Sequence, residues 1–403
     1  MITKPDGHIL FLAHRVPYPP DRGDKIRSWN ILKALAKLAP VHVAALVDPA
    51  DVVTEDSPLH RLVASLTLLP RRRSRAVAIL SALAKGSTAS VELFADADFS
   101  AAVQAILNEQ PISHIYAFSG QMAQHVPQDL GSTRFVMDFV DVDSAKFSDF
   151  AKRGNVINRF ANTHEGKRLF AFELAVAKRA DISLFVSEAE AALFRTDTGL
   201  GSDKVRALEN GIDLERFAPG DAKPIAQSGP NPMLLFTGQM DYAPNVDAVC
   251  WFAKEVLPRL PNITFIIAGR APTPAVQALA AHSHIIVTGE VTDTRPYIAA
   301  ADVVVAPLRI ARGVQNKVLE AMAMGKPVVA SREAAEGIDA LADRDLIVAD
   351  GADQFAAALS MLLNDKAKAD VLGIAARAQM ERRYGWDAQM ASLPAILAVC
   401  SAT

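Results

Sequence analysis

The feature that most constrains the fold of this chain is a regular alternation of short apolar runs and longer helical stretches. In the first half, the apolar runs are Ile9–Ala13, Val41–Leu46, Leu66–Leu69, His114–Ala117, Phe135–Asp138 and Ile182–Val186. Short runs of this kind, separated by helices, are typical of parallel strands that are covered on both faces of the sheet. The sequence therefore predicts an α/β fold built on a parallel sheet.

The alternation stops at residues 219–232 and then restarts. This segment holds four prolines and two glycines, which is typical of a linker. The strands predicted after it are Met233–Thr237, Thr264–Ala268, His284–Val287, Val303–Ala306, Pro327–Ala330 and Leu346–Ala349. Because 403 residues exceed one ordinary core, we predict two doubly wound domains, residues 1–218 and 233–379, joined by the linker 219–232.

Composition narrows the class of protein. The net charge of −3 gives no global field that would favour nucleic acid. The two cysteines, Cys250 and Cys400, imply no disulfide framework and fit a reducing compartment. The first residues lack the apolar stretch of a signal peptide, and no window approaches about 20 uninterrupted apolar residues. We therefore expect a cytoplasmic protein.

The stretch from Arg312 to Ser331 is the strongest candidate for a ligand site. Gly313 allows the backbone to approach a ligand closely, and free amides at the helix start near Asn316 attract phosphate. Lys317 adds a positive charge, and Glu320 can accept two hydrogen bonds from a diol such as ribose. The local sequence leaves an alternative open, an ordinary helix-to-strand connection with a Gly-Lys-Pro exit.

Other candidates follow the strands of the second domain. Ligands of doubly wound domains bind beyond the carboxyl ends of the strands, so we expect the active site in the cleft between the domains. Gly238 permits close approach, and Val291 lies where backbone groups would meet a nucleobase edge. Arg270 would pair with a diphosphate in bidentate fashion or form a surface ion pair.

The first domain offers two loops. The loop after its first strand is predicted to bind phosphate or a polyol through Arg22, Gly23, Asp24, Lys25 and Arg27. The alternative is that Asp24 caps the helix and the cations are solvated.

The second loop carries Asp141 and Asp143, which would act as bases or contact sugar hydroxyls. Ordinary turn chemistry is the alternative. No third ligand stands at a diagnostic spacing, so we predict no metal site.

A basic run, Arg71–Arg75, precedes the apolar stretch Ala76–Ala84. A cationic start followed by an apolar helix is typical of contact with an anionic membrane surface. The alternative is a solvated loop beside a core helix.

Together these residues resemble glycosyltransferase family 4, retaining enzymes of the GT-B fold, over nearly the whole chain. The motifs are Pro19-Pro-Asp-Arg-Gly23, Val186-Ser-Glu188, Asn210-Gly-Ile-Asp213, Phe217-Ala-Pro219, Gly238, Ala268-Gly-Arg270, Ala301-Asp-Val-Val-Val-Ala-Pro307 and Glu320-Ala-Met-Ala-Met-Gly-Lys-Pro-Val-Val. The combination of Asp241-Tyr-Ala-Pro-Asn-Val-Asp247 with Gly313-Val-Gln-Asn-Lys317 resembles a subgroup of sugar transferases encoded with exopolysaccharide and exosortase systems.

The resemblance implies a GT-B fold, with two Rossmann-like domains facing a central cleft and a last helix, about 380–403, that crosses back to the first domain. It implies transfer of a hexose from a UDP or GDP sugar to a saccharide or a polyprenyl-diphosphate-linked acceptor, with no metal or other cofactor. Glu320 would bind the donor ribose. The diphosphate would be bound by Lys317 and Arg270. The amides of Gly313, Val314, Gln315 and Asn316 would hold the hexose or phosphate.

Three positions depart from the family pattern. Arg312 replaces the first glutamate of the Glu-x7-Glu motif, and Gln239–Asn245 stand where an Arg-x4-Lys phosphate pair is expected. Phe139–Asp141 replace a histidine, so Asp141 or Asp143 would take part of its catalytic role, beside Lys317. These departures keep two alternatives open: a non-hydrolysing nucleotide-sugar epimerase using His14 and the Asp141 region, and a non-catalytic sugar-binding protein.

Overall fold

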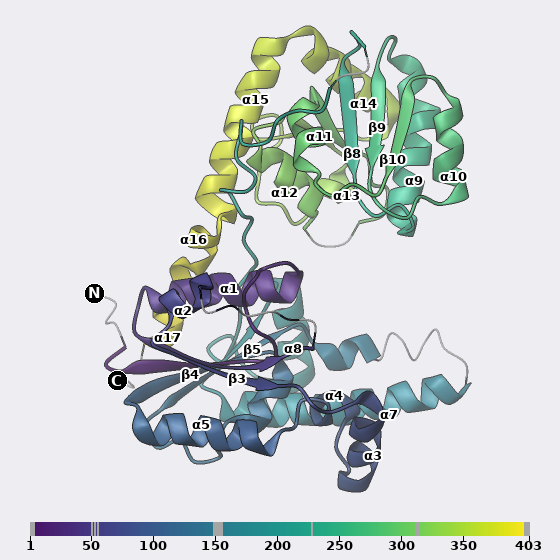
Figure 1. The fold of residues 1–403 in the computed structure, drawn as a ribbon. Coiled ribbons are helices and arrows are strands. Elements are labelled where there is room, and N and C mark those ends of the chain that lie inside the picture. Colours follow the sequence, from purple (N-terminus) through teal and green to yellow (C-terminus); the bar gives the residue numbers. More distant parts are fainter. Residues whose placement is uncertain are drawn as a thin grey trace. The chain divides into compact units, whose positions relative to one another are not determined.

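The computed structural model describes residues 5–49, 51, 54, 56–147, 156–226, 229–311 and 314–398. The chain forms two compact units, one of Met1–Asn210 with Gln389–Thr403 and one of Gly211–Ala388. Each unit contains one parallel sheet with helices packed against it (Figure 1). The prediction of two doubly wound α/β domains is therefore confirmed.

The first unit contains a seven-stranded sheet of order β3-β2-β1-β4-β5-β6-β7. Its strands are β1 (His8–Ala13), β2 (Val41–Val47), β3 (Ser65–Pro70), β4 (Ile112–Phe118), β5 (Arg134–Val140), β6 (Ile182–Phe185) and β7 (Val205–Ala207). Its helices are α1 (Gly23–Ala36), α2 (Pro58–Leu62), α3 (Arg75–Lys85), α4 (Ala89–Glu92), α5 (Ala97–Glu109), α7 (Val156–Arg179), α8 (Glu188–Thr198) and α17 (Leu393–Leu397). Strands β1 and β2 are buried along almost their whole length, as expected for strands covered on both faces.

The end of the chain packs on this first unit. His114 Nε2 donates to the carbonyl of Leu397 at 2.9 Å, and Arg134 Nη1 donates to the carbonyl of Ala398 at 2.9 Å. Leu393, Ile396 and Leu397 are buried. The last helix therefore belongs to the domain formed by the beginning of the chain.

The second unit contains a six-stranded sheet of order β10-β9-β8-β11-β12-β13. Its strands are β8 (Met233–Thr237), β9 (Thr264–Ala268), β10 (Ile285–Gly289), β11 (Val303–Ala306), β12 (Val328–Ala330) and β13 (Ile347–Val348). Its helices are α9 (Ala243–Trp251), α10 (Pro274–Ala278), α11 (Arg295–Ala300), α12 (Asn316–Ala323), α13 (Arg332–Ala335), α14 (Gly351–Asn364), α15 (Lys366–Gln379) and α16 (Trp386–Gln389).

The strand order of the second unit reverses at β8 and β11. The connections from β8 lead outward through β9 to β10, whereas the connections from β11 lead the other way to β12 and β13. Such a reversal is a topological switch point, and ligands of open α/β sheets bind at the carboxyl ends of the strands beside it. No helix within the described residues is long and apolar enough to cross a membrane.

Candidate active site

Three strand ends of the second unit meet at glycines. The amide of Gly238 donates to the carbonyl of Ala268 at 3.0 Å, and the amide of Gly269 donates to the carbonyl of Gly289 at 3.1 Å. A Cβ atom on Gly269 would lie 1.7 Å from the carbonyl oxygen of Gly238. Only glycine at position 269 permits this approach, so the ends of β8, β9 and β10 present bare backbone.

Lys317, in the first turn of α12, reaches this glycine corner. Its Nζ donates to Asn245 Oδ1 at 2.6 Å and lies 4.0 Å from the centre of the Phe236 ring. A Cβ atom on Gly238 would come within 3.2 Å of Lys317 Nζ and 2.8 Å of Asn245 Nδ2. Gly238 therefore leaves room for the ammonium and for its amide partner.

Glu320 stands one turn further along α12. Burial raises the pKa of Glu320 to about 7, although Arg216 and Lys317 oppose the rise. Burial likewise lowers the pKa of Lys317 to about 7, against the attraction of Glu320. Within the described residues, neither side chain forms an ion pair, and the Glu320 carboxylate receives no hydrogen bond. A ligand that brings an anion to Lys317 and hydrogen-bond donors to Glu320 would stabilise the charged form of each side chain.

The start of α12 adds backbone donors. The first amides of a helix, here those of Asn316 and Lys317, lack an acceptor within the helix. Val314 is exposed and Gln315 is the residue that precedes the helix. Arg312 and Gly313, both predicted to contact the donor, lie outside the described residues.

Arg270 and Val291 follow the neighbouring strands. Arg270 Nη2 donates to Gln239 Oε1 at 2.9 Å, and the Arg270 carbonyl accepts from the amide of Met240 at 2.8 Å. These bonds tie the loop after β9 to the loop after β8, and leave the Arg270 side chain exposed. Val291 is partly exposed beyond β10.

In the first unit, two cations of the predicted phosphate loop point inward. Arg27 is 1% exposed and binds the carboxylate of Asp138 at 3.0 Å through Nη2. Its Nη1 donates to the carbonyl of Leu208 at 2.7 Å. Tyr116 donates to the same carboxylate at 2.8 Å, and burial raises the pKa of Tyr116 well above its usual value. Lys25, also 1% exposed, donates to Asp51 at 2.7 Å.

The rest of that loop forms an ion-pair cluster. Asp24 accepts from Arg15 at 2.7 Å and lies 3.2 Å from His14 Nε2. Burial opposes ionisation, but these two bonds hold the pKa of Asp24 well below its usual range. The Arg22 side chain is 45% exposed and lies within 4 Å of Asp24 without a close bond. Gly23, at the start of α1, has open space around it.

Asp141 and Asp143 share one lysine. Lys146 Nζ donates to Asp141 at 2.7 Å and to Asp143 at 2.9 Å. Burial by itself would lower the pKa of Lys146. The two carboxylates outweigh this effect and hold its pKa above the usual range. The structure brings these predicted residues together, and it adds a lysine that the sequence argument did not use.

Strained backbone marks the same strand ends. Val140, the last residue of β5, has φ of +72°, and Ser119, directly after the adjacent β4, has φ of +74°. Positive φ is an outlier for a β-branched residue and often accompanies functional sites. Nearby, Glu173 accepts from Ser144 Oγ at 2.5 Å, and burial raises the pKa of Glu173 to about 7. Sequence reasoning missed Ser119 and Glu173, because neither their backbone conformation nor their burial leaves a local signal.

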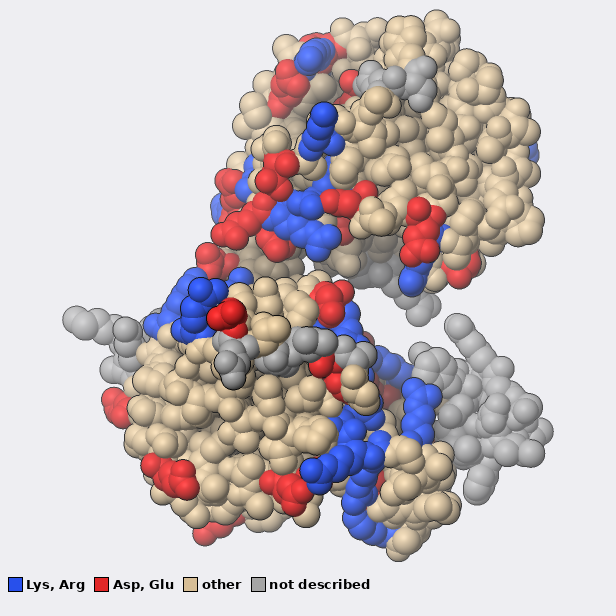
Figure 2. Space-filling view, in the orientation of Figure 1, with Lys and Arg blue, Asp and Glu red and all other residues tan. Residues whose placement is uncertain are grey.

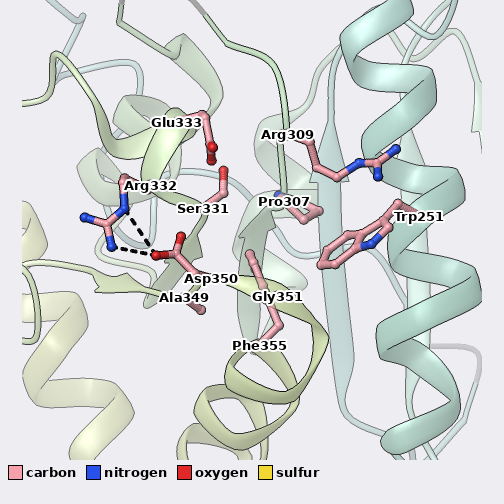
Figure 3. A pocket seen from close by; sticks show the side chains of 10 residues that line it. All are labelled: Trp251, Pro307, Arg309, Ser331, Arg332, Glu333, Ala349, Asp350, Gly351 and Phe355. Carbon is pink, nitrogen blue, oxygen red and sulfur yellow. Dashed lines mark hydrogen bonds and ion pairs between the residues drawn. The ribbon is translucent and has the colours of Figure 1, made fainter.

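A separate pocket of about 490 Å³ opens at the carboxyl ends of β11, β12 and β13 (Figure 3). It is lined by Trp251, Pro307, Arg309, Ser331, Arg332, Glu333, Ala349, Asp350, Gly351 and Phe355. Its arginines are already paired, Arg309 with Asp247 at 2.9 Å and Arg332 with Asp350 at 2.6 Å. Of the predicted donor residues that the structure describes, none lines this pocket. We therefore place the candidate site at Lys317 and Glu320, where charges are unmatched.

Residues 231–365 match the family model of glycosyl transferases group 1. A GDP-mannose-dependent alpha-(1-6)-phosphatidylinositol monomannoside mannosyltransferase of Mycobacterium tuberculosis is 26% identical over 233 residues, 53% of this chain and 60% of that protein. The protein of the same name from Mycolicibacterium smegmatis is 28% identical over 242 residues, 55% of this chain and 63% of that protein. The chain thus spans less than two thirds of the length of these relatives.

Solved structures share the fold of the whole chain. Sucrose-phosphate synthase from Thermosynechococcus elongatus has a TM-score of 0.61 at 19% identity, covering 97% of this chain and 98% of its own. HepE from Anabaena, in complex with UDP, has a TM-score of 0.59 at 16% identity, covering 97% and 99%. WaaG, a glycosyltransferase involved in lipopolysaccharide biosynthesis, has a TM-score of 0.57 at 17% identity, covering 96% and 99%. The chain has the GT-B fold, and the sequence matches favour a glycosyltransferase enzyme.

Proposed function

We propose that this chain is a retaining glycosyltransferase that moves a hexose from a nucleoside-diphosphate sugar to a saccharide or lipid-linked saccharide, in exopolysaccharide or cell-surface glycan synthesis. The observation that carries the proposal is the unmatched pair on α12. Lys317 and Glu320 are both mostly buried, both have a pKa displaced to about 7, and neither has an ion-pair partner within the described residues. A diphosphate joined to a ribose supplies both missing partners.

Lys317 would supply the ammonium that the absent Arg-x4-Lys pair provides in the family pattern. The family pattern places an arginine and a lysine after the first strand of the second domain, where this chain has Gln239–Asn245, and Asn245 lies in the first turn of α9. Lys317 Nζ lies 2.6 Å from Asn245 Oδ1, so an ammonium reaches this segment from α12 instead. A diphosphate beside Gly238 would meet Lys317, and Arg270 would stand next to it through Gln239.

Glu320 would hold the ribose. A carboxylate accepts two hydrogen bonds from vicinal hydroxyls, and hydrogen bonds to the charged form favour that form. Binding would therefore return the pKa of Glu320 toward its ordinary value. The same event would raise the pKa of Lys317, because the diphosphate favours its ammonium form.

The transfer breaks the bond between the anomeric carbon and the diphosphate oxygen, and the acceptor oxygen forms its new bond on the same face of the sugar. The acceptor proton leaves with the nucleoside diphosphate. Negative charge grows on the leaving diphosphate, where Lys317 and the first amides of α12 would stabilise it. These groups act on charge that develops during the reaction, which is how an enzyme favours the transition state over the substrate.

The donor base would be uracil or guanine. The mycobacterial relatives are named as GDP-mannose-dependent, and solved structures of HepE hold UDP and UDP-glucose. Both donor classes therefore belong in the first experiment.

The acceptor would be contacted by the first unit. Asp141 and Asp143, joined by Lys146, are accessible to acceptor hydroxyls. Of the loop cations, Arg22 is the one exposed enough to meet the phosphates of a polyprenyl-diphosphate acceptor, because Lys25 and Arg27 are each 1% exposed and paired.

Calorimetry with UDP, GDP, ADP and TDP tests the donor site, with Glu320→Ala, Lys317→Gln and the control Glu333→Ala. Glu333 lies on α13 of the same unit and lines the separate pocket. We expect one diphosphate to bind the wild type, about 10- to 100-fold weaker binding by each α12 variant, and no change in Glu333→Ala. If folded wild type binds none of the four, the chain is not a nucleotide-sugar transferase.

A turnover assay separates the alternatives. Release of nucleoside diphosphate that depends on an added saccharide or lipid-linked acceptor supports transfer. Conversion of UDP- or GDP-sugars to isomers without an acceptor would instead identify an epimerase, and binding without either reaction a non-catalytic protein.

A further inference from the structure

Helix α3 of the first unit turns its large apolar side chains outward. Its buried residues are two alanines, Ala78 and Ala82, which are 1% and 6% exposed. Its large residues are instead exposed: Val77 by 51%, Ile79 by 52%, Leu80 by 68% and Leu83 by 68%. These four are among eleven large hydrophobic side chains that are exposed in the described residues, so one short helix holds a disproportionate share.

The outward orientation is fixed by polar contacts on the inner face. Ser81 Oγ, Lys85 Nζ and Arg73 Nη1 all donate to the carboxylate of Glu92, at 2.6, 3.0 and 2.9 Å. Glu92 is 5% exposed and belongs to α4, against which α3 packs. Turning the helix to bury Leu80 would remove Ser81 and Lys85 from Glu92 and leave a buried carboxylate without them. The apolar face therefore stays in solvent.

The helix is also well defined at both ends. The Ser74 side chain accepts from the amide of Val77 at the N-terminus, and Gly86 ends the helix with φ of +67°. At 100° per residue, Ile79, Leu83, Leu80 and Val77 lie within an arc of about 160°. This arc contains no charged residue, since its other members are Ala76 and Ala84.

Positive charges surround this apolar face. Arg72 and Arg75 are exposed, whereas Arg71 pairs with Asp48, and Arg73 and Lys85 pair with Glu92. Figure 2 shows a band of Lys and Arg side chains beside the uncharged lobe where α3 lies at the edge of the first unit. Arg72 pairs with Asp98 at 3.1 Å, but both side chains are about two-thirds exposed, so this pair is easily exchanged for another anion.

We propose that α3 is a membrane-docking helix that lies on an anionic bilayer. Leu80 and Leu83 would enter the boundary between headgroups and acyl chains, while Arg72 and Arg75 would contact anionic headgroups. An apolar face of this width with a basic rim is typical of helices that lie in the plane of a membrane interface.

The positive charges beside α3 favour an anionic bilayer, rather than a second copy of the chain, as the partner of this helix. A two-fold interface brings the same patch of each copy together. Pairing through α3 would therefore set the basic rim of one copy against the basic rim of the other, and like charges would repel. An anionic surface satisfies the apolar face and the basic rim at once.

Docking on a membrane is independent of the donor chemistry, whereas the further step to a lipid-linked acceptor rests on the proposed function. That step narrows the acceptor class to saccharides carried on a lipid. Loss of docking and loss of donor binding are separable, because α3 belongs to the first unit and Lys317 and Glu320 to the second.

Co-sedimentation of the full chain with vesicles tests the proposal. The vesicles are phosphatidylcholine alone or mixed with phosphatidylglycerol, and the variants are Leu80→Ser/Leu83→Ser and Arg72→Gln/Arg75→Gln. The matched control is Val371→Ser/Ile374→Ser, which changes two side chains on α15 that are 66% and 70% exposed. All six positions are exposed, so the variants are expected to fold.

We expect the wild type and the control to bind anionic vesicles equally. The leucine variant should bind anionic vesicles more weakly than the wild type, by about tenfold or more. The arginine variant should lose most of the salt-sensitive part of the binding. UDP or GDP binding by calorimetry should be unchanged in both α3 variants. Absence of wild-type binding to either vesicle, or equal loss in the α15 control, would overturn the proposal. A dimer that Leu80→Ser/Leu83→Ser disperses, without vesicle binding, would assign the face to a second copy.

Discussion

The substitution Glu320→Gln should strengthen the fold and weaken ligand binding at the same time. The Glu320 carboxyl has its pKa raised by burial to about 7, so the folded state resists its ionisation. In the unfolded chain the same group ionises at its ordinary value of 4.5. Stability is therefore lost as the pH rises from 4.5 toward about 7, and the loss is complete above that. Glutamine is uncharged at every pH and escapes this loss.

The size of the effect follows from the two pKa values. A rise from 4.5 to about 7 corresponds to a ceiling of about 3 kcal/mol. Glu320 retains partial access to solvent, which screens the charge, so we expect a gain of about 1 to 2 kcal/mol at pH 8. For a unit of the size of Gly211–Ala388, this gain corresponds to a rise in melting temperature of about 3 to 6 °C.

Thermal unfolding at pH 4.5 and pH 8, with and without the nucleoside diphosphate that the wild type binds, measures both effects. The variant should melt higher than the wild type at pH 8 and at the same temperature at pH 4.5. The nucleotide should raise the melting temperature of the wild type more than that of the variant. The control Glu333→Gln should shift melting little at either pH. Lower melting of Glu320→Gln at pH 8 would refute the argument, since it would mean that the carboxylate stabilises the protein by itself.

Three further outcomes follow from other contacts. Lys317→Met should raise the melting temperature strongly at pH 6 and much less at pH 10, because burial lowers the pKa of this lysine to about 7 and the cost shrinks as the pH approaches 10.5, where the unfolded chain also loses the proton. Gly269→Ala should destabilise the second unit by at least about 2 kcal/mol in urea unfolding, because its Cβ would meet the Gly238 carbonyl at 1.7 Å. Arg27→Met should cost the first unit about 3 to 5 kcal/mol by the same assay, because it leaves Asp138 buried without its cation, and Arg27→Met/Asp138→Leu should recover part of that loss.

The strands of the second unit were predictable because their signal is local. Apolar runs gave Met233–Thr237, Thr264–Ala268 and Val303–Ala306 with the bounds that the structure shows for β8, β9 and β11. Strand β7 (Val205–Ala207) was missed, since three residues with an arginine in the middle do not form an apolar run. Its place in the sheet comes from pairing with β6, which is a tertiary contact.

The destinations of charged side chains were not predictable from their neighbours in sequence. Arg22, Lys25 and Arg27 stand close together in the chain, yet Arg22 is largely exposed and the other two are buried. The difference arises from distant carboxylates, because Arg27 meets Asp138 from β5, 111 residues away. Burial of a cation requires such a partner, and single-sequence patterns do not reveal it.

Helix α3 shows the same limit for apolar residues. The apolar stretch after the basic run indicated a helix, and the structure contains one at Arg75–Lys85. Its periodicity did not reveal which face points inward, because two alanines and a serine offer a small inner face beside a leucine-rich outer one. Glu92 selects the inner face through Ser81 and Lys85, and Glu92 lies outside the helix.

The position of Lys317 in the first turn of α12 has a consequence for binding. Its neighbours Val318 and Met322 are buried against the sheet, so α12 fixes the stem of the lysine before any ligand arrives. A lysine at position 245 would instead extend from the first turn of α9, and holding its flexible stem at this corner would cost side-chain entropy on binding. Since Lys317 Nζ and Asn245 Oδ1 are 2.6 Å apart, the exchange Lys317→Gln/Asn245→Lys should place an ammonium near the same point. We expect the exchange to bind the nucleoside diphosphate better than Lys317→Gln alone but about tenfold more weakly than the wild type. Equal weakness of the exchange and the single variant, by calorimetry on folded proteins, would show that the location of Lys317, and not its charge at this corner, determines binding.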